Sequence, residues 1–489
     1  MIHHTRSFLA SFAALACTLH AAAAVRYVDA TLATGAGTGT SWADAYAGPG
    51  ALQAALAASV AGDELWVKAG TYRPSTSGAR TASFTMKTGV GIYGGFAGTE
   101  SARDQRDWRS NVTVLSGDLL GNDSGTANLT DNAYHVVVGT GATATGVLDG
   151  FTVRGGNSNG ASASNYDKGG GIIVYASGAP TVRNCVFSGN RCTFGGGAGY
   201  IFTAQATFTD CTFDSNEGGS YGGAFDTNNV TSTFTRCVFR NNGAARAGAV
   251  ETYGAGNTTY VNCLFTGNRS TGSGGGAALW IGVSSSVVTA RNCTFSANVA
   301  TSVAGGVNTT SGGTLNAANC IFWANTGPGG TTAANQVNAG GGTNSVSWSV
   351  VQGGFTGTGN TSTNPLFTNA AGGDYTLGAA SPAIDAGSNS LVPAGTTVDL
   401  AGLPRFVNVP GVTDTGSGTA PIVDRGAYEV QDNTPPCLAD LTRNGVVDGS
   451  DLGVLLGDWS GSASGDINGD GTTNGADLGL MLSAWGQCP

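Results

Sequence analysis

The middle of the chain repeats one pattern of apolar and polar positions every 26 to 30 residues. Each copy places Cys and Phe two positions apart, so that both face the same side of a strand, and Asn follows three positions after Phe. A repeat of this length predicts supersecondary units that stack and share one core. The six copies begin at Cys185, Cys211, Cys237, Cys263, Cys293 and Cys320.

A second motif, Gly-Gly followed by small and apolar residues, lies between the copies. Stacked strands are about 4.8 Å apart, so the repeat predicts inward columns of Cys and Phe and a column of Asn at a bend. Asn tolerates the left-handed backbone and can form ladders of side-chain amides. Stacked cysteines have Cβ atoms farther apart than the about 3.8 Å of a disulfide. We therefore expect mostly buried free thiols, and Cys192 as another unpaired cysteine.

Together the two motifs resemble the polymorphic outer-membrane-protein repeat. That family implies an all-β fold, a right-handed parallel β-helix (solenoid) of the pectate-lyase type, which we expect over residues 25–362. Its N-terminal part would contain a short helix at Ala51–Ala58 and a strand within Asp63–Pro74. The fold is shared by proteins of many activities and does not by itself indicate a function.

The remaining segments have different compositions. Residues 363–430 resemble the choice-of-anchor segment of bacterial surface proteins and are expected to cover the open edge of the last turn of the β-helix. Residues 431–436 read as a linker. Residues 437–489 are expected to form a small α-helical, EF-hand-like module.

Residues 1–24 have the pattern of a secretory signal peptide: a polar basic start, an apolar stretch, and small residues before a cleavage site after Ala24. Lipidation at Cys17 is the alternative. No later stretch approaches the about 20 apolar residues of a membrane-spanning helix. We therefore expect a mature protein without a transmembrane segment, either secreted to the extracellular space or held at the cell surface.

Composition narrows the class of partner. The chain has 489 residues, a net charge of -10 and only 11% charged residues. It has no basic patch, so nucleic acid is not an expected partner.

The C-terminal segment holds two copies of one acidic loop, at residues 440–451 and 466–477. Oxygen-bearing side chains occupy positions one, three, five, nine and twelve, Gly occupies position six, and position seven offers a backbone carbonyl. This spacing suits a hard cation such as Ca²⁺. The two predicted sites comprise Asp440, Thr442, Asn444, Val446, Asp448 and Asp451, and Asp466, Asn468, Asp470, Thr472, Asn474 and Asp477.

Each loop leads into an apolar helix, and the tandem arrangement resembles the type I dockerin. The resemblance implies docking to a cohesin-like or other surface protein, and a disulfide between Cys437 and Cys488 because the two ends of that module meet. The chain departs from the family at loop positions ten and eleven. Gly449-Ser450 and Gly475-Ala476 stand where dockerins commonly present two hydroxyls.

Alignment of the repeats predicts surface ion pairs between neighbouring turns, namely Asp210–Arg236, Asp214–Arg240 and Glu217–Arg191.

Two further carboxylates, Asp226 and Glu251, occupy equivalent places without an aligned basic partner. Strand alternation turns them outward, where we expect them to be solvated. They are the best candidates for catalysis that the sequence offers, and His135 lies in an apolar strand and is expected to be structural.

Two functions follow from these observations. The first is a secreted or cell-surface β-helix protein, non-catalytic and adhesin-like, that is tethered through its calcium-binding tail. The second is an extracellular polysaccharide lyase or glycoside hydrolase. The scarcity of His, Lys and convergent carboxylates favours the first, and a polysaccharide is a candidate ligand for either.

Overall fold

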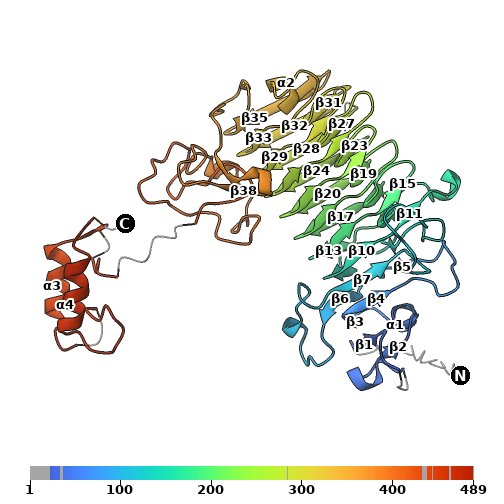
Figure 1. The fold of residues 1–489 in the computed structure, drawn as a ribbon, viewed down its shortest axis with the longest axis horizontal. Coiled ribbons are helices and arrows are strands. Elements are labelled where there is room, and N and C mark those ends of the chain that lie inside the picture. Colours follow the sequence, from blue (N-terminus) through green and yellow to red (C-terminus); the bar gives the residue numbers. More distant parts are fainter. Residues whose placement is uncertain are drawn as a thin grey trace, which may run out of the picture. The chain divides into compact units, whose positions relative to one another are not determined.

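The computed structural model describes residues 23–33, 37–283, 285–431, 438–442, 444–461 and 464–487 (Figure 1). Most of the predicted signal peptide, including Cys17, lies outside these residues, as do residues 432–436 of the predicted linker and both Cys437 and Cys488. In the described part of the chain, no helix has both the length and the apolar character needed to cross a membrane.

Three long parallel sheets form the body of the fold, and the chain visits them in turn, so that each circuit makes one rung (Figure 1). We name them sheets A, B and C. Sheet A consists of β1 (Val25–Asp29), β2 (Tyr46–Ala47), β3 (Glu64–Lys68), β6 (Gly91–Phe96), β9 (Val147–Asp149), β13 (Thr181–Arg183), β17 (Gln205–Thr209), β20 (Thr231–Thr235), β24 (Gly256–Val261), β28 (Ser286–Arg291), β32 (Thr314–Ala318) and β35 (Thr343–Ser347).

The other two sheets follow the same order along the solenoid. Sheet B consists of β4 (Gly70–Tyr72), β7 (Thr113–Ser116), β10 (Thr152–Arg154), β14 (Val186–Ser188), β18 (Thr212–Asp214), β21 (Val238–Arg240), β25 (Leu264–Thr266), β29 (Thr294–Ser296), β33 (Ile321–Trp323) and β36 (Val350–Val351). Sheet C consists of β5 (Phe84–Thr85), β8 (Val137–Val138), β12 (Ile172–Tyr175), β16 (Gly199–Phe202), β19 (Phe225–Asn228), β23 (Val250–Tyr253), β27 (Leu279–Gly282), β31 (Val307–Thr310) and β34 (Val337–Gly340).

Short elements connect these sheets. The predicted N-terminal helix is present as α1 (Ala51–Ala58), and the predicted strand after it is present as β3 and β4. A four-residue helix, α2 (Ala333–Gln336), follows β33. Small parallel sheets at the bends pair β11 (Asn157–Ser158) with β15 (Arg191–Cys192), and β26 (Arg269–Ser270) with β22 (Gly243–Ala244) and β30 (Val299–Ala300).

The chain divides into two compact units. The first comprises Met1–Thr289, Phe295–Asn316 and Ala324–Ser345. The second comprises Ala290–Thr294, Ala317–Trp323 and Val346–Pro489.

The predicted columns of Cys and Phe form the core. The rings of Phe213 and Phe239 stack with centroids 4.8 Å apart, and those of Phe239 and Phe265 with centroids 4.5 Å apart. The Cys237 thiol donates to the carbonyl oxygens of Thr235 at 3.4 Å and Phe208 at 3.6 Å. The prediction of buried free thiols is confirmed for Cys185, Cys192, Cys211, Cys237, Cys263, Cys293 and Cys320.

The predicted amide ladder is also present. Each ladder Asn donates its side-chain amide to the side-chain oxygen of the next one, as Asn216 does to Asn242 at 3.0 Å. The run ends where Asn325 donates to Oε1 of Gln336 at 2.8 Å. The expectation that these asparagines tolerate the left-handed backbone does not apply to them, because that conformation lies one position earlier, for example at Asn241 with φ 56°. The ladder comprises Asn190, Asn216, Asn242, Asn268, Asn298 and Asn325.

Within the second unit, residues 363–430 pack beside strands of sheet B. They contain the antiparallel pair β37 (Phe367–Asn369) and β38 (Asp374–Leu377). Leu377 and Ile384 join Ile321 of β33 and Val350 of β36 in one apolar cluster. Arg405 is fully buried in this segment, and its Nε lies 3.5 Å from Oε2 of Glu429.

Candidate functional site

The two acidic loops of the C-terminal module fold alike. In the first loop, Oδ1 of Asp440 accepts the backbone N–H of Asn444 at 3.0 Å, and Oδ2 accepts that of Gly445 at 2.8 Å. In the second, Asp466 accepts the N–H of Asp470 at 3.1 Å and that of Gly471 at 2.8 Å. The carboxylate at position one therefore organises the sharp turn at the glycine in both copies.

Position twelve holds a buried carboxylate in each loop. Burial alone would raise the pKa of Asp451, but the backbone N–H groups of Asp448 and Thr442 outweigh it and hold that pKa below its usual value. The N–H of Asn474, with those of Asn468 and Ile467, likewise lowers the pKa of Asp477. Both groups are thus kept as anions inside their loops.

The other predicted ligand residues surround these carboxylates. Asp448 and Asn474 cap α3 (Gly449–Gly457) and α4 (Gly475–Ser483), accepting the N–H groups of Ser450 and Ala476. Asn444 and Asp470 each accept the N–H two residues ahead, at 2.9 Å.

Over the described residues, no three His, Cys, Asp or Glu side chains converge as a metal cluster. A bound ion would therefore also need the amide, hydroxyl and carbonyl oxygens of the loop, a mixed oxygen set that suits Ca²⁺.

A small apolar core holds the two loop–helix units together. Leu455 of α3 and Met481 of α4 are buried in it with Val447 and Ile467. The strands β39 (Val446–Val447) and β40 (Gly486–Gln487) pair in antiparallel orientation beside it.

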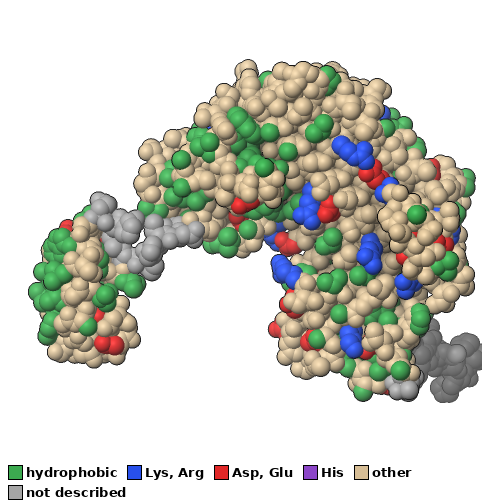
Figure 2. Space-filling view, viewed as in Figure 1, with side chains coloured by type: hydrophobic (Ala, Val, Ile, Leu, Met, Phe, Trp, Pro, Cys, Tyr) green, Lys and Arg blue, Asp and Glu red, His purple; other side chains and the backbone are tan. Residues whose placement is uncertain are grey.

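The outer side of the same two helices is apolar as well. Leu456 and Trp459 are exposed, and so are Leu482 and Trp485, which lie 26 positions later in the second copy. Figure 2 shows hydrophobic side chains gathered over this module. Exposed apolar groups that lie together are typical of interaction surfaces. We call these four residues the duplicated apolar face.

The two candidate catalytic carboxylates are not solvated, so that prediction is wrong. Asp226 and Glu251 are register partners on β19 and β23 and are only 3% and 2% exposed. Strand alternation does turn them away from the core, but the connecting segments fold over them. A side chain at Gly195 of the Gly-Gly motif would clash with the Asp226 carboxylate, so glycine lets the chain pass directly across it.

Glu251 also has a basic partner that the alignment of repeats did not show. Arg246, on the segment leading into the same strand, donates to Glu251 through Nε at 2.9 Å and through Nη2. Its guanidinium lies between the rings of Tyr221 and Trp280, 4.3 and 4.0 Å from their centroids. Glu251 is thereby held in a closed, ion-paired position.

Burial raises the pKa of Asp226 well above its usual value, and the charge of Glu251 raises it further. Burial also raises the pKa of Glu251, although Arg246 opposes this. Because Arg246 pairs with Glu251, the charged form of Asp226 is the less favoured of the two.

The surface ion pairs form largely as predicted. Arg236 contacts Asp210 at 2.7 Å and Arg240 contacts Asp214 at 2.9 Å. Figure 2 shows such adjacent basic and acidic groups on the face it presents.

The third predicted pair differs. Arg191 is in register with Glu217, but the carboxylate of Glu217 contacts Arg269, two rungs on. Gly243 occupies the register position between them and has no side chain to block the contact.

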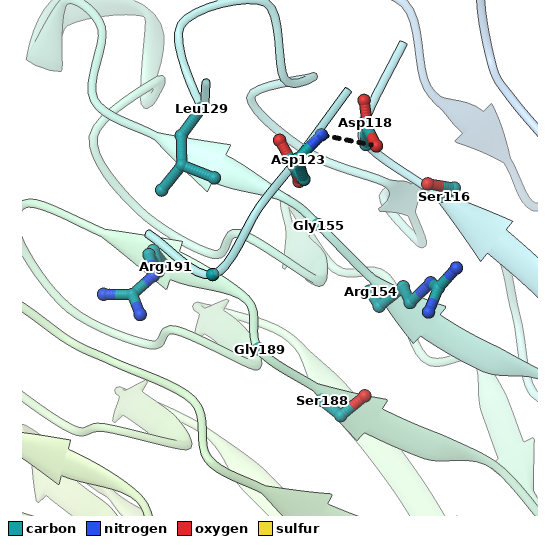
Figure 3. Close-up of a pocket in the computed structure, with 10 residues that line it drawn as sticks. Ser116, Asp118, Asp123, Leu129, Arg154, Gly155, Ser188, Gly189 and Arg191 are labelled. Carbon is teal, nitrogen blue, oxygen red and sulfur yellow. Dashed lines mark hydrogen bonds between the residues drawn. The ribbon is translucent and has the colours of Figure 1, made fainter. Parts of the chain in front are cut away.

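A cleft of about 320 Å³ that the sequence did not predict lies at one end of the early strands of sheet B (Figure 3). Arg154 and Ser116 are register partners there, and Arg191 lines the same cleft. The loop after β7 contributes Asp118 and Asp123, and the backbone N–H of Asp123 donates to Oδ2 of Asp118 at 3.3 Å.

One oxygen of Asp123 is buried and, among the described residues, has no hydrogen-bond partner. Burial raises the pKa of Asp123, and the charges of Asp118 and Asp131 raise it further. The hydrogen bond from Asn132 and the charge of Arg154 act in the opposite direction. The loop has no counterpart in the repeats, which is why alignment of the rungs could not reveal it.

His135 is buried, and its Nδ1 lies 3.0 Å from the carbonyl oxygen of Gly169. Burial lowers its pKa. These contacts agree with the structural role expected of it.

Comparison with known proteins bears on the fold. A family model described as "Right handed beta helix region" matches residues 122–282 and 170–348. The solenoid is a right-handed parallel β-helix. Among solved structures, the "Crystal structure of pectate lyase Pel9A" aligns with a TM-score of 0.44 and 14% identity, over 84% of this chain and 97% of its own. A search of curated proteins gave no match.

Proposed function

We propose that this protein is a secreted or cell-surface β-helix protein that binds its ligand without cleaving it and docks through a calcium-dependent C-terminal module. One observation carries the proposal: two equivalent acidic loops lead into two helices that expose the same apolar residues. A dockerin-like module requires duplication of both the loop and the face. A domain with only a structural role would need neither the two loops nor the exposed apolar residues.

Calcium would be held by the side chains and carbonyls at positions one, three, five, seven, nine and twelve of each loop. When bound, the ion would neutralise the carboxylates that crowd each turn. Because the loop at each site also caps a helix, through Asp448 and Asn474, ion binding would be coupled to the folding of the module.

The partner would be a cohesin-like or other surface protein with a complementary apolar surface. Positions ten and eleven lack the hydroxyl pair, whereas Leu456, Trp459, Leu482 and Trp485 remain exposed. Trp is enriched among residues that dominate binding energies. The duplicated apolar face, rather than a hydroxyl pair, would then provide most of the contact.

The test uses the full-length mature protein and washed envelopes of the cells that produce it. With Ca²⁺ the protein should sediment with the envelopes, and with EGTA it should stay in the supernatant. A Leu456→Ser/Leu482→Ser double variant should stay in the supernatant under both conditions. Leu120→Ser alters another exposed leucine, outside the module, and is the matched control. Calcium-independent sedimentation would contradict the proposal.

The absence of cleavage is supported by the state of Asp226 and Glu251. Both carboxyl groups are covered, and Arg246 with its two flanking rings fixes one of them. A catalytic carboxyl must reach the proton it transfers. These two residues are better suited to holding the connecting segments against the β-helix.

A second function, cleavage of an acidic polysaccharide, is favoured by the cleft of Figure 3. Arg154 and Arg191 could bind carboxylate groups of a uronate chain, and Asp123 has the raised pKa of a general acid. New reducing ends or unsaturated products from polygalacturonate or alginate would support it, provided that Asp123→Asn abolishes them and Glu251→Gln does not.

A further inference from the structure

A row of exposed rings follows one face of the β-helix. Tyr175, Phe202, Asn228 and Tyr253 end the consecutive strands β12, β16, β19 and β23, and they are register partners. The three aromatic side chains are 37%, 41% and 41% exposed. Rings of this size are usually buried, so three in register on one outer face mark a binding surface.

The ring of Phe202 is flanked by a second ring on the same strand. It lies nearly parallel to the ring of the buried Tyr200, with centroids 6.2 Å apart and 15° between the planes. The strand backbone spaces the positions of the row at about 4.8 Å per strand, and Asn228 lies between Phe202 and Tyr253. The strand positions and the packing of Phe202 are therefore fixed before binding, which reduces the entropy cost.

A cleft of about 360 Å³ begins directly beyond this row, at the bend between sheets C and A. Its polar lining consists of hydroxyl and amide side chains, and none of its lining residues is charged: Ser177, Thr203, Gln205, Asn229 and Thr231 carry its polar groups. Asn229 is held by two contacts, because it accepts the N–H of Ala255 and donates to Oδ1 of Asn228, each at 2.8 Å.

We infer that this row and its cleft bind a neutral polysaccharide chain. Sugar rings present apolar C–H faces that stack on aromatic rings, and their hydroxyls exchange hydrogen bonds with amides and hydroxyls. A uronate or sulfated chain would find no cation among the residues that line this cleft, in contrast to the arginine-lined cleft of Figure 3. The inference does not depend on the C-terminal module.

The test is isothermal titration of the full-length mature protein with xyloglucan, glucomannan and mixed-linkage β-glucan, and with polygalacturonate for comparison. Saturable binding to at least one neutral glycan is expected, with equal affinity in Ca²⁺ and in EGTA. Phe202→Ala and Tyr253→Ala should each weaken it by about tenfold or more. Tyr253→Phe, which keeps the ring, should retain most of the affinity.

Phe406→Ala is the control, since Phe406 is similarly exposed but lies in residues 363–430. Three results would overturn the inference. The protein binds no neutral glycan, the ring variants bind the glycan as well as the wild type does, or the ring variants lose affinity only for polygalacturonate. Calcium independence separates this result from the docking proposal, because a chain that fails to dock should still bind the glycan.

Discussion

Asp226 and Glu251 are register partners on adjacent strands, and Arg246 binds one of these two buried carboxyl groups, Glu251. Two like charges so close cannot both ionise without cost. Ionisation is therefore disfavoured at Asp226, whose pKa is raised by burial and by the charge of Glu251. The contribution of this pair to the stability of the fold therefore depends on pH.

Replacing Asp226 with Asn should remove that pH dependence. The folded-state pKa of Asp226 is raised, so its stabilising effect is present below the unfolded value of about 3.9 and is lost as pH rises through the folded value. Asn mimics the protonated form. In thermal unfolding, the melting temperature of Asp226→Asn relative to that of the wild type should therefore increase as pH rises from 4 to 8. A constant gap between the two would contradict this.

The amide ladder should be sensitive to a single deletion. Asn242 accepts from the side chain of Asn216 and donates to Oδ1 of Asn268, each at 3.0 Å, and all three are buried. Oδ1 of Asn242 also accepts the backbone N–H of Asn216, and its side-chain amide also donates to the carbonyl oxygen of Phe213. Asn242→Ala removes all of these contacts, which should cost about 2–3 kcal/mol in urea unfolding.

Asn241→Gly is the control for the ladder. Asn241 precedes the ladder residue and already has φ 56°, a conformation that glycine adopts without strain. Its unfolding free energy should change by less than about 1 kcal/mol. Equal losses in both variants would show that the bend, and not the ladder, provides the stability.

Arg405 should be essential for the stability of residues 363–430. Its side chain is fully buried, pairs with Glu429, and donates through Nη2 to the carbonyl oxygens of Asp424 and Gly426 at 2.8 Å. Arg405→Met leaves Glu429 buried with no basic partner among the described residues and only the backbone N–H groups of Asp424 and Val407 as donors, and it should cost about 3–5 kcal/mol.

The double variant Arg405→Met/Glu429→Leu removes both charges and should be more stable than the single variant. The stability of this segment in both variants is measured by limited proteolysis within residues 363–430 at increasing denaturant concentration. An additive loss in the double variant would contradict a coupled buried pair.

Much of the fold could be predicted because the repeat fixes which residues stack. The spacing of Cys237 and Phe239 places both on one face, and the next copy repeats that face one strand later, so the core and the ladder follow. The acidic loops could be predicted for a related reason. Glycine at position six and Asp at positions one and twelve, such as Asp466 and Asp477, specify the turn locally.

What the sequence did not reveal depends on the connections between strands. Alternation turns Asp226 outward, but Gly195 lets the preceding rung cover it, and Arg246 lies outside the aligned columns. The contact of Glu217 with Arg269 depends on the absence of a side chain at Gly243. The alignment does contain this glycine. Asp118 and Asp123 lie on a loop with no counterpart in other rungs, so no periodic argument reaches them.

Calorimetric titration of the full-length protein with Ca²⁺ tests the central claim most directly. The wild type should bind two ions with Kd of about 1 mM or tighter. Asp440→Asn/Asp466→Asn, which removes the carboxylate at position one of both loops, should bind none in that range. Asp374→Asn, an exposed carboxylate outside the module, should match the wild type. Absence of heat at millimolar Ca²⁺, or equal binding by the double variant, would contradict the account.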